Sequence, residues 1–142
     1  MKASARNQFF GQIAAVHDGS IHDEVELQIA SGLRVVATVT RASRTALGLQ
    51  PGARALALVK ASSVVIVTDA AGVRFSARNQ FAGTVGQVTR GAVNSEVALA
   101  LPGGERLVAI VTNESADGLG LAAGQPATAL FKAGSVIIGV PA

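Results

Sequence analysis

The feature that most constrains this chain is an internal repeat at a fixed offset. The hexapeptide Ser-Ala-Arg-Asn-Gln-Phe begins at Ser4 and recurs at Ser76, 72 residues later. The same offset aligns the rest of the chain without a gap, and close to half of the aligned positions are identical. A repeat of this kind decides the fold before any single element does. It predicts two domains of one type, residues 1–70 and 71–142, with a boundary near Asp69–Gly72.

Within each repeat, apolar and polar residues alternate in short runs that are rich in β-branched side chains. Such period-two patterning is typical of strands. Strands are predicted for residues 9–16, 24–29, 33–40, 55–60 and 63–68, and again 72 residues later. One helical turn is expected at 42–47, ended by Gly48. The pattern favours an all-β protein of two tandem OB-like Greek-key β-barrels, each with one short helical turn, and a small sandwich is the alternative.

The composition excludes several classes of protein. The chain has no cysteine, which rules out disulfides and thiolate metal sites. No apolar run reaches the roughly 20 residues that span a bilayer, and the N-terminal residues lack the apolar core of a signal peptide. We therefore expect a cytoplasmic protein with no membrane partner. The net charge of +3 biases its surface toward anions.

Nothing in the sequence indicates an enzyme or a coordinated metal. The two histidines, His17 and His22, have no counterpart in the second repeat and are interpreted as surface residues. A metal site needs several convergent ligands. Glu24 and Glu96 form the one carboxylate position that both repeats share, so no carboxylate pair for acid–base catalysis is visible.

The repeats share hydrogen-bond donors at three separated points. These are the Ser-Ala-Arg-Asn segment at the start, a Thr and a Ser flanking the helical turn, and a Lys followed by small residues between the last two strands. A tetrahedral dianion presents only acceptor oxygens, so hydroxyls, backbone N–H groups and one or two cations hold it best. A donor-only shell suits hydrogen phosphate less well, because that proton needs an acceptor. The same side chains could instead cap turns and strand ends, and the residues alone leave both interpretations open.

These three elements, in this order and present twice, resemble the Mop, or molbindin, domain family. The resemblance covers the whole chain. It implies OB-like barrels and, for tandem members, a homotrimer. It also implies that molybdate or tungstate is bound between domains through hydrogen bonds. The metal would then have no direct protein ligand, and no catalytic cofactor is implied. It also implies a role in molybdenum storage or homeostasis in the cytoplasm.

The resemblance further implies which residues meet the anion. One domain would contribute Ser4, Ala5, Arg6, Asn7, Thr40 and Ser43, and a neighbouring domain Lys60, Ala61, Ser62 and Ser63. The second set would be Ser76, Ala77, Arg78, Asn79, Thr112, Ser115, Lys132, Ala133, Gly134 and Ser135. The sets differ where Gly134 replaces Ser62, which matters only if that position binds through its hydroxyl. Further anion sites on a threefold axis are placed by conjecture in the turns at Ser20–Glu24 and Ala92–Glu96.

Two other functions remain open at this point. A nucleic-acid-binding OB protein fits the fold and the basic pI, but a chain with five Phe, no Trp and no Tyr has few rings on which bases could stack. We therefore expect no nucleic-acid partner. A molybdate-sensing regulatory module is the other alternative, and it would need a separate output partner.

Overall fold

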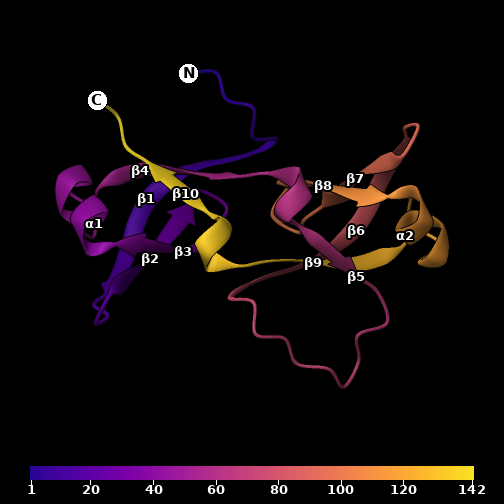
Figure 1. Ribbon diagram of the computed structural model, residues 1–142, viewed down its shortest axis with the longest axis horizontal. Helices are drawn as coiled ribbons and strands as arrows, with labels where there is room; N and C mark the ends of the chain where they lie inside the picture. Colours follow the sequence, from indigo (N-terminus) through magenta and orange to yellow (C-terminus); the bar gives the residue numbers. More distant parts are fainter. The chain divides into compact units, whose positions relative to one another are not determined.

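The computed structural model describes residues 1–142, and the chain divides into two compact units. The first unit comprises Met1–Val59 together with Lys132–Ala142, and the second comprises Lys60–Phe131. Both ends of the chain therefore belong to the first unit (Figure 1). No helix has the length and apolar character that crossing a membrane requires.

The first unit is a five-stranded antiparallel sheet in the order β10-β4-β1-β2-β3. Its elements are β1 (Asn7–His17), β2 (His22–Ile29), β3 (Arg34–Thr40), α1 (Arg41–Leu47), β4 (Arg54–Val59), the 3-10 turn η2 (Ala133–Ser135) and β10 (Ile137–Gly139). The two outer strands, β10 and β3, contact each other. The sheet is therefore curled into a barrel-like unit.

The second unit repeats this arrangement in the order β5-β9-β6-β7-β8. Its elements are the 3-10 turn η1 (Ala61–Ser63), β5 (Val65–Val67), β6 (Asn79–Arg90), β7 (Asn94–Ala100), β8 (Arg106–Thr112), α2 (Asn113–Gly118) and β9 (Pro126–Phe131). The predicted all-β class with two barrel-like units is confirmed. The predicted strands and helical turn all exist, and their ends are shifted by one or two residues.

The units do not coincide with the two repeats predicted at 1–70 and 71–142. The last strand of the first repeat, β5, pairs with β9, whereas the last strand of the second repeat, β10, pairs with β4. Figure 1 shows the exchange in colour, with yellow β10 beside the purple strands and magenta β5 beside orange β9. Because β4 and β9 offer equivalent edges, the alternation of side chains predicts the last strand but not the edge that it joins.

The core of each unit consists of the apolar residues that alternate along its strands. Val25, Leu27, Val35 and Ala37 are fully buried in the first unit, as are their counterparts in the second. The exchanged strands contribute to these cores, since Ile138 on β10 and Ile66 on β5 are also buried. At roughly 25 cal/mol per Å² of apolar surface, this burial is the main reason that each exchanged strand stays in place.

Gly11 and its counterpart Gly83 lie where the backbone of a neighbouring strand comes close to β1 and to β6. A Cβ atom on Gly11 would lie 2.1 Å from the carbonyl oxygen of Gln28, and one on Gly83 would lie 2.5 Å from that of Ala100. No side chain fits there without moving the backbone. The repeated glycine is therefore required by the close approach of the neighbouring strand.

The turn between β7 and β8 carries a carboxyl group that the first repeat lacks. Both carboxylate oxygens of Glu105 are shielded from solvent and have no hydrogen-bond partner. The counterpart of Glu105 in the first repeat is Leu33. A carboxylate that loses its hydration without gaining a partner destabilises the folded state.

We expect Glu105→Leu to stabilise the protein by about 1 to 3 kcal/mol, because it removes an unpaired buried polar group. Thermal unfolding followed by circular dichroism measures the effect as a rise in Tm. The reciprocal change, Leu33→Glu, serves as the control and is expected to lower Tm. An unchanged or lower Tm for Glu105→Leu would show that the carboxylate has a compensating partner.

Candidate functional site

The first group of predicted donors lies where the longest strand of each unit begins. Asn7, the first residue of β1, is buried and pairs with Val59, the last residue of β4. In the second unit, Asn79 is buried in the same way and pairs with Phe131. The Ser-Ala-Arg segment therefore leads directly into the β1–β4 or β6–β9 ladder.

Two tight turns that begin with a lysine, the lysine corners Lys60–Ser63 and Lys132–Ser135, follow the same ladders along the chain. Lys60 comes directly after Val59, and Lys132 comes directly after Phe131. The strand register thus places the start of β1 and the beginning of the Lys60 corner at the same end of the β1–β4 ladder. The start of β6 and the Lys132 corner are related in the same way by the second ladder.

Each lysine corner is a single 3-10 turn with a buried anchor. The Ser63 backbone N–H donates to the Lys60 carbonyl at 2.9 Å, and Ala61 between them is buried. Lys60 and Ser62 are exposed. The turn therefore presents an ammonium group and a hydroxyl to solvent while its alanine fixes the backbone.

The difference between Ser62 and Gly134 has no effect on packing. A Cβ atom built on Gly134 would meet no atom within 4 Å, and both positions are exposed. The backbone is the same in both turns, because Ser135 donates to the Lys132 carbonyl at 3.0 Å. The two corners consequently differ by one hydroxyl and not by shape.

The second group of predicted donors caps the short helices. The Thr40 hydroxyl oxygen accepts the backbone N–H of Ser43 at 3.1 Å and donates to the Ser43 hydroxyl at 2.9 Å. Thr112 and Ser115 repeat both bonds at the same distances. These are N-cap interactions, which explain why each helix begins where it does. All four side chains are exposed.

One unit does not bring all three groups of donors together. Asn7 and His17 are the two ends of β1. His17 pairs with Glu24, and the neighbouring His22 pairs with Thr40. The Thr40 cap therefore lies at the opposite end of β1 from Asn7, which at about 3.3 Å per residue is roughly 30 Å away along the strand. The Ser4–Asn7 segment and the Thr–Ser cap of one unit cannot contact the same small anion.

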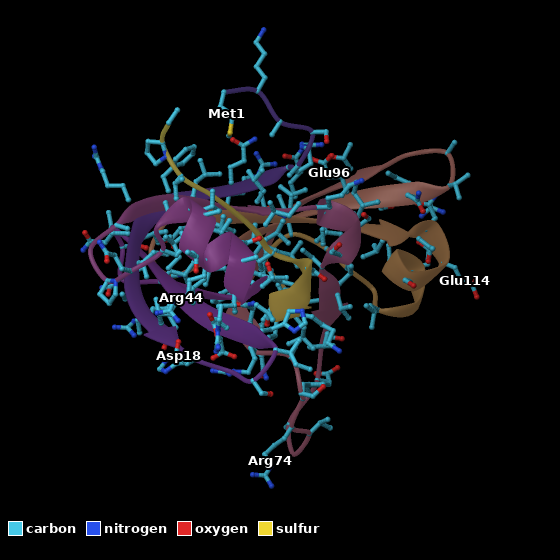
Figure 2. The ribbon with its side chains drawn as sticks, turned by 60° about the vertical axis from the view of Figure 1, so that its left-hand side comes forward. Met1, Asp18, Arg44, Arg74, Glu96 and Glu114 are labelled. Carbon is cyan, nitrogen blue, oxygen red and sulfur yellow. The ribbon has the colours of Figure 1, made fainter.

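A buried carboxylate organises the loop beside the first helix. Asp23 accepts the Gly19 backbone N–H at 3.0 Å, the Arg41 guanidinium at 3.3 Å and the Arg44 guanidinium at 3.2 Å. Arg44 also pairs with Asp18, and Figure 2 shows these two side chains pointing toward each other. The Gly19 N–H and then the two guanidinium groups hold the pKa of Asp23 below its usual value, against the opposing effect of desolvation.

In the second unit, the same positions carry an uncharged network. Ser95 replaces Asp23 and donates its hydroxyl proton to the Asn113 side-chain oxygen at 2.6 Å. Asn113 replaces Arg41 and donates to the Gly91 carbonyl at 3.0 Å. Neither network can be found from the residues that are identical in the two repeats, because the positions involved differ between them. The sequence does hold one signal for them, since Asp23 and Arg41 are replaced together, by Ser95 and Asn113.

His17 lies on the surface beside a carboxylate. His17 lies 2.6 Å from Glu26 and its side chain is 58% exposed, and Glu26 also binds Arg34 at 3.1 Å. The contact with His17 and then the Arg34 guanidinium lower the pKa of Glu26. No three His, Cys, Asp or Glu side chains converge on one point.

A groove of about 900 Å³ in the first unit lies away from every predicted anion residue. Its lining includes Phe10, Leu56 and Pro141, with Arg54 as the one basic side chain. The groove is too large and too apolar for a tetrahedral anion. The exposed groups among the predicted donors, such as Lys60 and the Thr40–Ser43 cap, lie outside this groove.

The TOBE domain family matches residues 3–66 and 76–138. The chain belongs to the TOBE domain family. The matched segments are the two repeats, and the predicted resemblance to tandem Mop domains is confirmed.

One solved structure resembles the chain over its whole length. The cytoplasmic molybdate-binding protein ModG, with molybdate bound, has 45% sequence identity and a TM-score of 0.95, and the match covers 99% of this chain and 100% of that one. Among curated proteins, the molybdenum transport protein ModE of Herbaspirillum seropedicae is 51% identical over 99% of this chain. The DNA-binding transcriptional dual regulator ModE of Escherichia coli K12 is 41% identical over 97% of it.

The match covers 52% of each of these two ModE proteins, so the chain spans about half the length of the curated relatives it matches. The names of these relatives describe molybdate binding, molybdenum transport and regulation, and none describes a catalysed reaction. The family is thus one of binding and regulatory proteins.

The buried Asp23 predicts acid sensitivity of the first unit. Because the pKa of Asp23 is lower in the folded protein, its ionised form stabilises folding above the unfolded value of about 3.9. That stabilisation is lost as the pH falls through the lower, folded value. We expect Tm to fall between about pH 5 and pH 2, and the Asp23→Asn variant to show a smaller fall than the unmodified chain.

Thermal unfolding at a series of pH values tests this expectation. Asp69→Asn is the matched control, because Asp69 is an exposed carboxylate with a left-handed backbone (φ 51°) that asparagine also tolerates. The control should keep the full pH dependence. An Asp23→Asn variant whose Tm falls as steeply as that of the unmodified chain would contradict the assignment.

Proposed function

We propose that this chain binds molybdate, and also tungstate, reversibly through hydrogen bonds at interfaces between copies of itself. The full-length likeness to ModG, whose structure holds molybdate, is the observation that carries the proposal. The role that we propose is cytoplasmic storage and homeostasis of molybdenum. No catalytic step and no direct protein ligand to the metal is part of it.

The donor chemistry of the repeats supports an oxyanion as the ligand. Each repeat offers a Ser-Ala-Arg-Asn segment, a Thr–Ser cap and a lysine corner, and the exposed groups among them include hydroxyls and a lysine ammonium. Fixed donors lose little freedom on binding, so they hold an acceptor-only anion well. Sulfate has the same charge and shape as molybdate. The chain would distinguish the two anions by the size of the space that the donors enclose.

Separation of the donors along β1 supports a site that is shared between copies. The Thr40 cap and the Asn7 segment of one unit lie at opposite ends of that strand. An anion that contacts both kinds of donor therefore needs one of them from another unit, and we propose that this unit belongs to a second copy. We propose that the Ser4–Asn7 and Lys60–Ser63 residues, with their second-repeat counterparts, meet Thr–Ser caps of neighbouring copies.

Exposed apolar residues support assembly into an oligomer, for which we propose a trimer. Ile21 and its counterpart Val93 are 75% and 72% exposed, and Val65 and its counterpart Ile137 are 56% and 63% exposed. Large apolar side chains that recur on the surface of both repeats are typical of interaction faces. The turns that hold Ile21 and Val93 are also those in which we place any threefold-axis anion sites.

A second candidate function is molybdate sensing. Relatives that are regulators contain this segment as about half of their length, which favours a sensor that acts through another part or partner. We propose that these 142 residues do not themselves bind nucleic acid, since they have no Trp or Tyr for base stacking. Steeply salt-dependent binding of single-stranded DNA would contradict this, and pull-downs with and without molybdate separate sensing from storage.

Native mass spectrometry combined with elemental analysis tests the main proposal directly. We expect a trimer that retains molybdenum after incubation with molybdate and gel filtration, and tungsten after incubation with tungstate. A monomer that carries neither element after incubation would refute the proposal.

The lysine corners provide a second test. We expect Lys60→Ala/Lys132→Ala to weaken molybdate binding by at least tenfold, because a buried anion that loses its cation is left uncompensated. Isothermal titration calorimetry measures the affinity and the number of sites. Lys2→Ala is the matched control, since Lys2 is the one other lysine of the chain and belongs to no predicted site. Unchanged affinity and stoichiometry in the double variant would refute the assignment of the corners.

A further inference from the structure

The two Thr–Ser caps have the same geometry but different neighbours. Both caps make their two bonds at 3.1 and 2.9 Å. The residue just before the serine of each cap is Ala42 in the first unit and Glu114 in the second. Because the caps are alike, a difference between them as anion sites comes from their surroundings, and within two residues of each cap that difference includes the charge of Glu114.

Every charge beside the first cap has a partner. The two cations of α1 are Arg41 and Arg44, and α1 contains no acidic residue. Arg41 pairs with Asp23, and Arg44 pairs with both Asp23 and Asp18. Two positive and two negative charges thus balance, and no charge in this cluster is uncompensated.

Beside the second cap, one negative charge is left over. Asp117 of α2 pairs with Arg90 at 2.7 Å. Glu114 is exposed and makes no ion pair or hydrogen bond, and it stands between Thr112 and Ser115 in the chain. Figure 2 shows its side chain projecting from α2. The helix has no basic residue in its last turn to offset this charge.

We propose that Glu114 makes the second cap the weaker anion site, so that dianions fill sites at the Thr40–Ser43 cap before sites at the Thr112–Ser115 cap. This inference rests on the proposed function, which places an oxyanion against both caps. The dianion is repelled by the carboxylate of Glu114. The dipoles of the two short helices play no part in this difference. For a carboxylate about 7 Å from a dianion in water, Coulomb's law gives a two- to tenfold loss of affinity, with the larger value at low ionic strength.

The repeat itself supplies reciprocal variants to test this inference. Glu114→Ala gives the second cap the residue of the first, and Ala42→Glu does the reverse. Glu114→Gln removes the charge while keeping the shape of the side chain. The control is Asp69→Asn, which removes one negative charge from an exposed residue outside both helices. Circular dichroism and gel filtration show whether each variant keeps its fold and its assembly.

Titration of the full chain with sodium molybdate, at low and at high ionic strength, measures the effect. The unmodified chain and Asp69→Asn should show two classes of site. In Glu114→Gln and Glu114→Ala the weaker class should tighten two- to tenfold at low salt, and high salt should reduce the gain. Ala42→Glu should weaken the tighter class by a similar factor.

The outcomes separate this inference from the proposed function. If the unmodified chain binds no molybdate, the proposed function fails and this inference fails with it. If the unmodified chain binds molybdate but both Glu114 variants titrate identically to it at low salt, only this inference is overturned. A gain that is equal in Asp69→Asn would also overturn it, because the effect would then follow net charge and not position.

Discussion

Antiparallel pairing between strands of different repeats is the interaction on which the structure depends. β10 completes the first sheet by pairing with β4, and β5 completes the second by pairing with β9. Each exchanged strand has only three residues, so a few backbone hydrogen bonds and one buried isoleucine hold it. Without that strand a sheet would keep four strands and an open edge. Neither repeat therefore makes a complete barrel from its own residues.

The exchange also determines where the predicted donors lie. The lysine corner follows β4 or β9 directly, where the chain leaves one unit for the other. Its lysine thus stands next to the ladder of one unit, while its 3-10 turn leads into a strand of the other. A change in this connection would alter two sheets and one donor group together. This coupling gives a physical reason for both repeats to keep Lys-Ala and the following Ser-Val.

The repeats have kept their backbone while their electrostatics have diverged. Asp23 and Arg41 hold the first turn through charges, whereas Ser95 and Asn113 hold the second through neutral hydrogen bonds. The backbone is the same because each network anchors the glycine turn beside the helix. Differences in charge of this kind leave the fold unchanged, and the lowered pKa of Asp23 gives the first unit a pH response that Ser95 cannot give the second.

Much of the fold followed from the sequence by itself, since the 72-residue repeat and the period-two alternation are local patterns that side-chain burial enforces. They determined the class, the strands, the helical turn and the kinds of donor present. Only the tertiary structure decided which edge each last strand joins, because β4 and β9 are equivalent partners. It also decided that Asn7 and Thr40 lie at opposite ends of β1, because strand register depends on contacts between residues far apart in the chain.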